Sequence, residues 1–353
     1  MKLLYVHNAD FSKPEANKVQ VTNMCHALRK IGVNLTLMGY NNSNEKISKY
    51  YTTPFDYKTI ILKSESNYYM RTLKLFRQFI KLKRDVDNIY TRDMMFALLV
   101  SFFFKKKKVI YELHEIHEKF LWKLLLKLTL KYVKNVVIVG EGVKTELKKR
   151  KYNITKIKVI PNAFNIEVID IKISKEDARM ELDWPKDKII VSYTGSSLER
   201  DLDTLFSVAK MNPAIQFYLY GSKQSELKNI PDNVFLKSFT KQPGLIGKAS
   251  DILFAGYNDK IMSQFYDISF LKIYELLASK RPFIISDFSL IRKQIGKGYA
   301  NYYPSGDVEI LNLILRKLIK HLSKYQKESE QNMDLVRENT YQARARKVER
   351  LFS

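Results

Sequence analysis

Three charged residues stand close together in the last third of the chain: Asp267, Lys272 and Glu275. Lys272 and Glu275 are three positions apart, so a helix would place both on one face. Asp267 precedes Glu275 by eight positions, which puts it in the loop that leads into this helix. Lysine can bind phosphate oxygens, and carboxylates can bind sugar and ribose hydroxyls. The spacing therefore suits a sugar nucleotide, and an ordinary ion pair on a helix surface is the alternative.

A second candidate is the turn after a predicted strand at 189–193. Gly195 and Ser196 are small, so backbone N–H groups there could approach a phosphate, and the N-terminus of the following helix favours an anion. Arg200 could add a cation. The segment contains neither a GxGxxG fingerprint nor a P-loop, so an ordinary strand-to-helix turn explains it about as well.

Predicted strands and helices alternate through the first half, and ligands of open α/β sheets bind at the carboxyl ends of such strands. The strands are expected at 2–6, 33–38, 60–62, 88–90, 109–111, 135–139 and 158–160. The helices are expected at 19–31, 94–104, 121–132 and 141–151. This succession predicts a doubly wound α/β domain.

The alternation restarts after a predicted connector at 162–186. The expected strands are 189–193, 215–220, 234–236, 252–255 and 282–285. The expected helices are 203–209, 243–248 and 271–279, with a helical stretch from 308 to 352. The chain is therefore predicted to be α/β, with two Rossmann-like halves in tandem and a C-terminal helical segment.

The chain resembles family 4 retaining glycosyltransferases of the GT-B fold, in which two Rossmann-like domains face each other across a cleft. Residues 269–287, SFLKIYELLASKRPFIISD, are similar to the family's donor-binding segment, which carries two acidic residues separated by seven positions. Other segments match in order and spacing: 89–93, 110–115, 159–163, 191–196 and 301–307. The resemblance covers essentially the whole chain.

The resemblance implies a domain organisation. Residues 1–165 would form the acceptor-side domain and residues 166–325 the nucleotide-sugar-binding domain. Residues 326–353 would form a helix that crosses back to the N-terminal domain. The donor substrate would be a nucleoside-diphosphate sugar, and the acceptor a glycan or a lipid-linked precursor of a cell-surface polysaccharide or glycolipid.

The resemblance also implies residue roles. The catalytic residues would be His114, Asp267 and Glu275, with His114 approaching the transferred sugar from the first domain and Asp267 contacting that sugar. Glu275 would also bind the ribose hydroxyls. The residues expected on the donor diphosphate are Gly195, Ser196, Arg200 and Lys272. Arg92 would face a phosphate of the acceptor or donor, or form an ion pair with Asp93 or Glu115.

Catalysis would rest on stabilising the charge that develops on the phosphate oxygens of the leaving nucleoside diphosphate. Lys272, Arg200 and loop N–H groups could do this with neither a metal ion nor a cofactor. The family retains anomeric configuration by front-face attack, so no protein nucleophile is expected.

Three departures from the family pattern keep a second function open. Asp267 stands where many members have glutamate, and the usual glycine pair near Pro14 is absent. The span from Gly195 to Arg200 is one residue short, and Asp201 replaces a common glycine. A catalytically silent relative that acts as a scaffold is therefore an alternative.

The composition narrows the class of protein. Among 353 residues there is one cysteine, which excludes a disulfide framework and a cysteine-rich zinc site. The 45% apolar content excludes global disorder. No run reaches the roughly 18 apolar residues that span a bilayer, and the N-terminus lacks the apolar core of a signal peptide. These features predict a cytoplasmic location.

The net charge of +24 is uneven: residues 1–170 carry +17 and the remainder +7. Residues 71–83, 102–108 and 119–131 combine lysines with aromatic and aliphatic residues. This pattern favours an anionic membrane surface, so we expect a peripheral protein on the inner face of the cell membrane. Lysine-rich codon usage is the other explanation. A basic nucleic-acid-binding protein is a further alternative, but no recognised nucleic-acid motif appears and no nucleic acid is expected as a partner.

Overall fold

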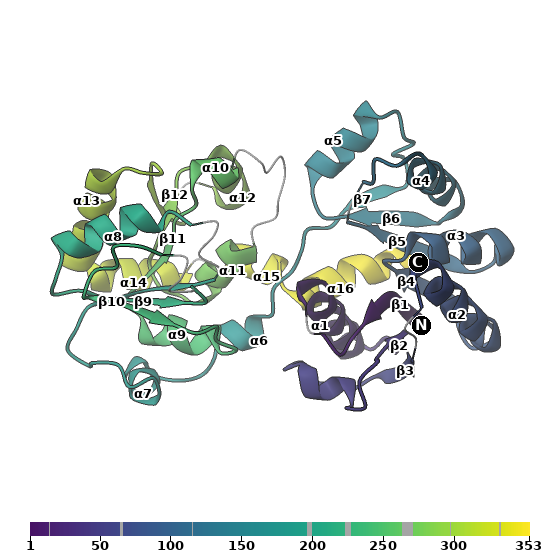
Figure 1. Ribbon diagram of the computed structural model, residues 1–353, viewed down its shortest axis with the longest axis horizontal. Coiled ribbons are helices and arrows are strands. Elements are labelled where there is room, and N and C mark those ends of the chain that lie inside the picture. The colour runs from purple at the N-terminus through teal and green to yellow at the C-terminus, as the bar shows by residue number, and fades with distance from the viewer. Residues whose placement is uncertain are drawn as a thin grey trace. The chain divides into compact units, whose positions relative to one another are not determined.

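The protein is described by a computed structural model that divides into two compact units (Figure 1). The N-terminal unit contains residues 1–163 and 341–353, and the C-terminal unit contains residues 164–340. The residues that the structure describes are 1–13, 15–63, 66–114, 116–195, 200–222, 227–262, 271–296, 298–331 and 333–353.

The N-terminal unit is built on a parallel sheet of seven strands in the order β3-β2-β1-β4-β5-β6-β7. The strands are β1 (Lys2–Asp10), β2 (Asn34–Tyr40), β3 (Lys58–Leu62), β4 (Asn88–Thr91), β5 (Lys108–Leu113), β6 (Asn135–Ile138) and β7 (Ile157–Val159). The strand order reverses between β1 and β4. That reversal is the point at which open α/β sheets bind ligands, outside the carboxyl ends of the strands.

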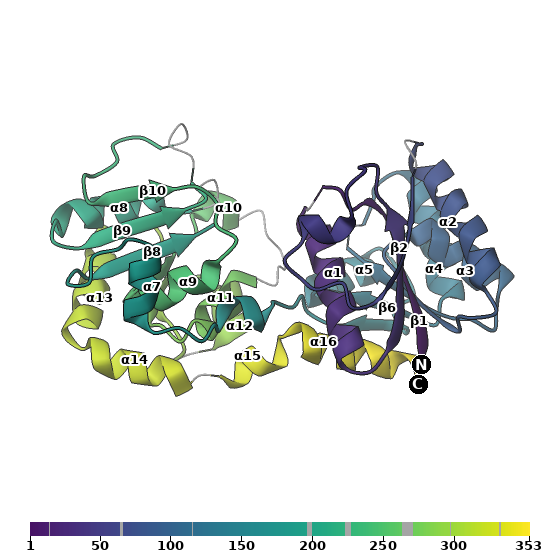
Figure 2. The ribbon, with the colours of Figure 1, turned by 90° about the horizontal axis from the view of Figure 1, so that it is seen from below.

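Helices cover both faces of this sheet. They are α1 (Ala16–Lys30), α2 (Tyr68–Leu82), α3 (Met94–Phe103), α4 (Phe120–Tyr132), α5 (Glu141–Lys149) and α16 (Tyr341–Glu349), with 3₁₀ turns at Ile47–Tyr50 and Arg350–Phe352. Leu3 and Tyr5 of β1 pack in the core that α1 and α16 share, whereas Leu4 and Val6 pack in the core under α2, α3 and α4. Figure 2 shows α1 and α16 on one face of the sheet and α2, α3 and α4 on the other. Burial on both faces explains why β1 is a continuous apolar run.

The C-terminal unit repeats this architecture on a six-stranded parallel sheet of order β10-β9-β8-β11-β12-β13 within the described residues. The strands are β8 (Ile190–Thr194), β9 (Gln216–Tyr220), β10 (Val234–Lys237), β11 (Ile252–Ala255), β12 (Phe283–Ser286) and β13 (Asn301–Tyr303). Its strand order reverses between β8 and β11, as the order in the other unit does between β1 and β4. The α/β class and the two Rossmann-like halves predicted from the sequence are therefore present.

The helices of the C-terminal unit complete its layers. They are α6 (Ile166–Ile169), α7 (Lys175–Glu181), α8 (Leu202–Met211), α9 (Pro243–Ala249), α10 (Asp259–Met262), α11 (Leu271–Ala278), α12 (Ser289–Ile295), α13 (Val308–Lys320), α14 (Leu322–Gln331) and α15 (Asp334–Glu338). Within the described part of the chain, no helix is long and apolar enough to cross a membrane.

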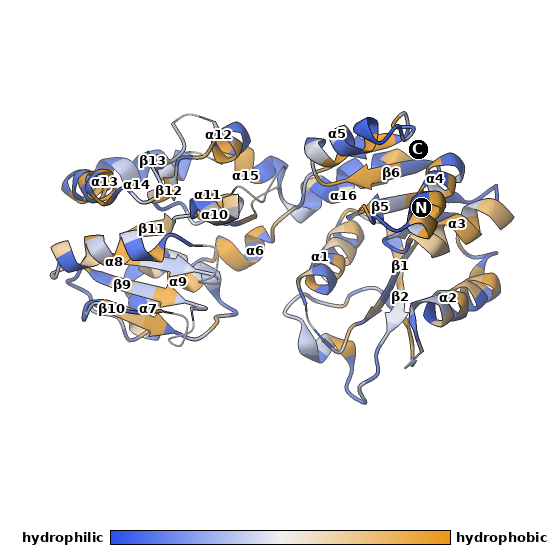
Figure 3. Cartoon of the chain, turned by 45° about the horizontal axis from the view of Figure 1, so that its top comes forward, coloured by the Kyte–Doolittle hydropathy of each residue, from blue (hydrophilic) through white to orange (hydrophobic). Residues whose placement is uncertain are grey.

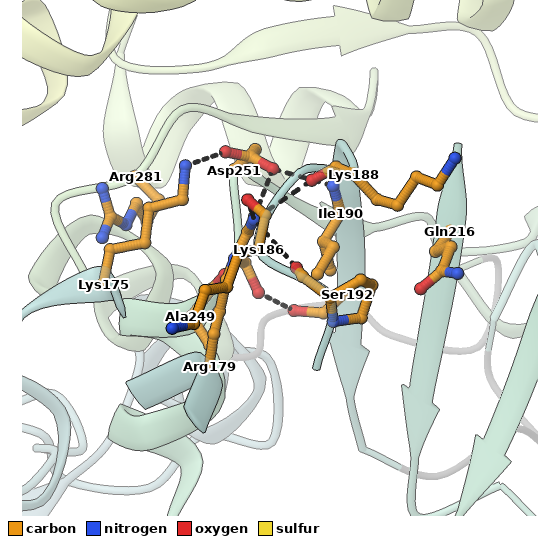
Figure 4. A network of polar contacts seen from close by, with 12 residues as sticks. Lys175, Arg179, Lys186, Lys188, Ile190, Ser192, Gln216, Ala249, Asp251 and Arg281 are labelled. Atoms are coloured by element: carbon orange, nitrogen blue, oxygen red, sulfur yellow. Dashed lines mark hydrogen bonds and ion pairs between the residues drawn. The ribbon is translucent and has the colours of Figure 1, made fainter. Parts of the chain in front are cut away.

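The predicted connector at 162–186 is a folded part of the C-terminal unit, because it contains α6, α7 and the buried Arg179. The Arg179 Nη2 atom lies 2.7 Å from Asp251 Oδ2, and the Nε atom donates to the Ala249 carbonyl at 2.9 Å (Figure 4). Its Nη1 atom donates to the carbonyls of Pro185, Lys186 and Lys188. One guanidinium thus fastens the segment before β8 to the end of α9.

The C-terminal helical stretch differs from the expectation in two ways. It is divided into α13, α14, α15 and α16 rather than being continuous. Residues up to 340 belong to the C-terminal unit, so the return to the N-terminal unit begins at Tyr341 and not at 326. The reason is packing, because Val336 of α15 lies in a core of the C-terminal unit, whereas Ala345 and Val348 of α16 lie in the core beside α1. The first boundary lies after 163, two residues before the expected one.

Candidate functional site

In the C-terminal unit, Lys272 and Glu275 lie in the first turns of α11 and face the carboxyl end of β8. The Lys272 Nζ atom lies 2.5 Å from Glu275 Oε2 and donates to Thr194 Oγ1 at 2.9 Å. Both charged side chains are partly exposed, at 18% and 29%. The structure therefore brings the lysine and the helix-borne carboxylate together at a strand end, where solvent and a ligand can reach them.

A small pocket lies beside this pair. Its volume is about 20 Å³, which is room for one or two water molecules and not for a nucleotide. The lining residues come from β8, β11, α9 and α11 and from the end of α6: Ile169, Ser192, Thr194, Pro243, Ile246, Gly247, Leu253, Phe254, Lys272, Glu275, Leu276 and Ser279. A ligand of nucleotide size therefore does not fit inside this pocket.

Two glycines keep the carboxyl ends of β8 and β9 free of side chains. Gly195 has φ +146° and Gly221 has φ +90°. A Cβ atom on Gly195 would lie 2.4 Å from the Tyr193 hydroxyl, and one on Gly221 would lie 2.8 Å from the Gly195 carbonyl oxygen. The Gly195 N–H donates to the Tyr220 carbonyl at 2.8 Å. Only glycine fits either position, so the backbone here can be approached closely by a ligand.

Arg200 is held between two tyrosines. Its guanidinium lies 3.9 Å from the centre of the Tyr257 ring, and its Nε atom donates to the Tyr193 hydroxyl at 2.8 Å. Burial opposes the charge, but the two phenol groups raise the pKa of Arg200 above its ordinary value. Its Nη1 atom is buried without a hydrogen-bond partner among the described residues. Arg200 is therefore a buried cation with one unsatisfied donor group.

Two predicted site residues, Asp267 and Ser196, lie outside the described residues. Asp201, noted above for replacing a common glycine, has a structural position. Its Oδ2 atom accepts hydrogen bonds from the Tyr303 hydroxyl and the Gly306 N–H, both at 2.9 Å, and its Oδ1 atom accepts one from Thr204. Asp201 thus joins the start of α8 to the loop after β13.

The side chains that could ligate a metal ion do not gather in the described part of the chain: no group of three or more His, Cys, Asp or Glu residues is placed to hold one. The chain contains Asp-x-Asp triplets at 85–87 and 201–203, and neither forms such a group. Both oxygens of Asp201 accept hydrogen bonds from the protein.

In the N-terminal unit, His114 follows β5 and is paired with a buried carboxylate. Its Nε2 atom lies 2.5 Å from Glu112 Oε1, and Tyr90 donates its hydroxyl hydrogen to Glu112 Oε2. His114 is 24% exposed and Glu112 is 2% exposed, so the imidazole reaches solvent and the carboxylate does not. Burial alone would raise the pKa of Glu112, but Arg344 and His114 lower it well below its ordinary value. Glu112 is therefore ionised at neutral pH.

Arg92 follows β4 and is anchored to α1. Its Nη1 atom donates to the Asn17 carbonyl at 2.9 Å and to Gln20 Oε1 at 3.3 Å. The alternative ion pair with Asp93 is not formed in the described structure, because Asp93 instead caps α3 through the Phe96 N–H at 2.7 Å. Its other proposed partner, Glu115, lies outside the described residues.

His7 lies near Arg92 and His114 and was not predicted from the sequence. Val6 pairs with Thr91 in the sheet, so His7 in β1 and Arg92 just after β4 lie at the same level. The His7 Nε2 atom is buried and has no hydrogen-bond partner among the described residues. Burial, and then the charges of Arg92 and His114, lower the pKa of His7 to about 3. The available signal was its position at the carboxyl end of the first strand, beside the reversal of strand order.

Solved structures share this architecture over almost their whole length. A glycosyltransferase from Rickettsia africae has a TM-score of 0.77 at 17% identity, with 99% of this chain and 97% of that one covered. HepE from Anabaena, solved with UDP-glucose, has a TM-score of 0.72 at 12% identity, with coverage of 100% and 99%. WaaG, a glycosyltransferase involved in lipopolysaccharide biosynthesis, has a TM-score of 0.63 at 12% identity and 98% coverage of each chain. The fold is therefore GT-B.

The sequence comparison identifies the family. Residues 18–168 match the model of Glycosyltransferase Family 4. No match was found among curated proteins. The predicted resemblance to family 4 glycosyltransferases of the GT-B fold is thereby confirmed.

Proposed function

We propose that this protein is a retaining, metal-independent hexosyltransferase that moves a sugar from a nucleoside-diphosphate sugar to a lipid-linked precursor of a cell-surface polysaccharide or glycolipid. The observation that carries the donor half of this proposal is the contact of Lys272 with Thr194 and Glu275 at the end of β8. The cation offers a partner for a phosphate, and the helix-borne carboxylate offers one for a ribose.

The Lys272 Nζ atom is the group that would meet the charge developing on the leaving phosphate. A preorganised cation in a partly desolvated site stabilises such charge more than water does. Glu275 would accept hydrogen bonds from the ribose hydroxyls while holding Nζ in place. Front-face attack by the acceptor, assisted by the leaving phosphate, gives retention without a protein nucleophile.

Thermal-shift measurements with UDP, GDP, ADP and TDP test the donor proposal, because a ligand that binds only the folded protein raises its melting temperature. HepE was solved with UDP-glucose, so UDP is the first nucleotide to try. A selective shift with one base supports a nucleotide-sugar donor. The absence of a shift with all four at millimolar concentration would overturn the donor site.

The membrane part of the proposal rests on the outer surface of α2, α3 and α4, which we name the basic face. Its exposed apolar residues are Tyr69, Met70, Leu73, Ile80, Phe102, Phe103, Phe120, Leu121 and Leu124. Its exposed basic residues are Lys74, Arg77, Lys81, Arg84, Lys105, Lys106, Lys119, Lys127 and Lys131. Figure 3 shows hydrophobic and hydrophilic residues mixed along α2. Apolar side chains among cations suit the headgroup region of an anionic bilayer.

Some lysines in and near the run at 105–108 are bonded to the protein itself, and others are exposed on the helix surfaces. Lys107 and Lys108 donate to the carbonyls of Val86 and Phe352, and Lys134 donates to the Ser353 backbone. These three are tied to the protein itself. The charges left to meet a membrane are therefore on the exposed helix surfaces and not on the whole run.

Sedimentation with vesicles tests membrane docking. Wild-type protein should pellet with vesicles that contain about one-third phosphatidylglycerol and remain soluble with neutral ones. A variant with Phe120→Ser and Leu121→Ser should pellet less, because these side chains are 82% and 52% exposed. Met180→Ser, at a 64% exposed site of the C-terminal unit, is the matched control. Equal recovery with neutral and anionic vesicles would reject docking through the basic face.

A further inference from the structure

Arg344 of α16 is a buried cation with contacts to two other segments of the N-terminal unit. Its Nη1 atom donates to the Ile160 carbonyl at 2.6 Å and also to the Pro161 carbonyl. Its Nη2 atom lies 3.1 Å from Glu112 Oε1, and both side chains are 2% exposed. One guanidinium thus joins the last helix, the segment after β7 and the carboxylate that holds His114.

These contacts lie where the chain passes between the two units. Ile160 and Pro161 come just before the first passage, after residue 163, and Arg344 comes just after the second, before residue 341. On the other side of the same boundary, within the C-terminal unit, the Phe164 N–H donates to the Asn339 carbonyl at 3.2 Å. Within each unit, hydrogen bonds therefore join the residues next to one passage to the residues next to the other.

Glu112 needs Arg344 in order to carry its charge inside the protein. A buried carboxylate without an adjacent cation is strongly disfavoured, and arginine offers a planar fork that can bond several oxygens at once. Lysine offers a point charge and cannot reproduce this set of contacts. The charge of Glu112 in turn fixes the His114 ring, since Nε2 must carry a hydrogen to donate to the carboxylate, which leaves Nδ1 as the atom able to accept from a ligand.

We propose that Arg344 is a positioning residue: through Glu112 it fixes the ring orientation and the Nε2–H tautomer of His114. Helix α16 therefore helps to position His114 at the carboxyl end of β5, in addition to covering the sheet. This inference rests on the proposed function in one respect, namely that His114 faces the transferred sugar. The link from Arg344 to the state of His114 can be measured without any activity.

Nuclear magnetic resonance of the full chain with ¹⁵N-labelled histidine tests the link directly, because ring ¹⁵N shifts report which nitrogen carries the hydrogen. His114 is assigned by loss of its signals in His114→Asn. The wild type should show the Nε2–H form. Arg344→Lys and Glu112→Gln should each move His114 toward a mixture of tautomers. Unchanged His114 signals in both folded variants would overturn the proposal.

Stability has to be separated from positioning, because removing one member of a buried ion pair leaves the other uncompensated. The double variant Arg344→Met/Glu112→Gln removes both charges and should unfold closer to the wild-type temperature than either single variant. If Arg344 and Glu112 have a purely structural role, the double variant should regain the wild-type His114 tautomer and the activity together with its stability. If Arg344 positions His114 through the Glu112 charge, the double variant should fold while His114 stays in a mixture of tautomers.

The matched control is the double variant Arg179→Met/Asp251→Asn, which removes a buried pair of the same kind from the C-terminal unit. It should leave the His114 signals unchanged. Donor hydrolysis and transfer are measured alongside, and Arg344→Lys should lower kcat about tenfold or more with little change in the KM for the donor. If wild type neither binds nucleotide nor transfers sugar, the proposed function fails while the ¹⁵N measurement still decides the role of Arg344.

Discussion

Lys272 and Thr194 are 78 positions apart, and the Nζ atom of one lies 2.9 Å from the Oγ1 atom of the other. This contact ties the start of α11 to the carboxyl end of β8, so a ligand that binds one of these elements meets the other. Because the same Nζ atom also lies against Glu275, the lysine is held extended over the strand end and not released into solvent. The cation is therefore held at the strand end before any ligand binds, and a preorganised cation can stabilise negative charge that develops beside it.

Removing either member of this pair should abolish most of the transfer reaction. Lys272→Ala removes the cation beside the phosphates, and Glu275→Ala removes both a ribose acceptor and the partner of Lys272. We expect each to lower kcat/KM by at least about 100-fold while the melting temperature changes little, because both side chains are partly exposed. Lys210→Ala, at an exposed position on α8, is the control. Near-normal turnover in both site variants would refute the assignment.

A methyl group at Gly195 should damage the donor loop specifically. Gly195→Ala would place Cβ against the Tyr193 hydroxyl at a φ of +146°, so the loop must shift. We expect a loss of about 1–3 kcal/mol in the free energy of unfolding and weaker nucleotide binding. Gly32→Ala is the matched control, because Gly32 also has positive φ but nothing lies within 4 Å of the added Cβ. If both variants lose the same stability and bind nucleotide equally, the close contact with Tyr193 has no consequence.

The strands and the fold class could be predicted because their signal is local. Parallel strands covered on both faces are short apolar runs, and β1, β8 and β11 lie where such runs were found. The segment that became α7 lacks such a run. Its position depends on the contact of Arg179 with Asp251, which is 72 positions away. A local hydrophobic pattern cannot predict such a long-range contact.

Part of the site was beyond sequence reasoning for the same physical reason. Arg200 is predicted to bind a phosphate, and the contact of its guanidinium with the ring of Tyr257, 57 positions away, could not be predicted from the sequence. His7 was overlooked because a single histidine after a strand has no pattern. Its importance comes from Arg92 on the neighbouring strand and from an unpartnered Nε2 atom, both of which appear only when the sheet is assembled.

The Arg179–Asp251 pair should control the stability of the C-terminal unit. Arg179→Met leaves the buried Asp251 carboxylate with the Lys175 ammonium and the Ile190 N–H as its remaining partners, and it frees the carbonyls before β8, so we expect a loss of about 1–3 kcal/mol in the free energy of unfolding. The double variant Arg179→Met/Asp251→Asn should recover part of this loss. Urea unfolding followed by a probe in this unit measures both. A single variant as stable as wild type would mean that the carbonyl contacts of Arg179 contribute nothing.

Acid should destabilise the protein partly through His7. Its pKa is about 3 in the folded protein and 6.5 as its ordinary value, chiefly because burial disfavours the charged ring. As the pH falls below 6.5, the unfolded chain binds a proton at this site and the folded chain does not, so the free energy of unfolding decreases. The contribution is up to about 1.4 kcal/mol per pH unit between roughly pH 6 and pH 4. Above pH 7.5 both states are neutral at His7 and no difference is expected.

The measurement is urea unfolding of wild type and His7→Gln at pH 8, 7, 6, 5 and 4.5. The glutamine variant removes the titrating ring but keeps a polar group at the carboxyl end of β1. The two proteins should have parallel stability curves above pH 7.5, and the wild-type curve should fall more steeply below pH 6. Parallel curves through the whole range would show that the His7 ring takes up its proton equally in both states, which would contradict a buried, unpartnered Nε2 atom beside Arg92.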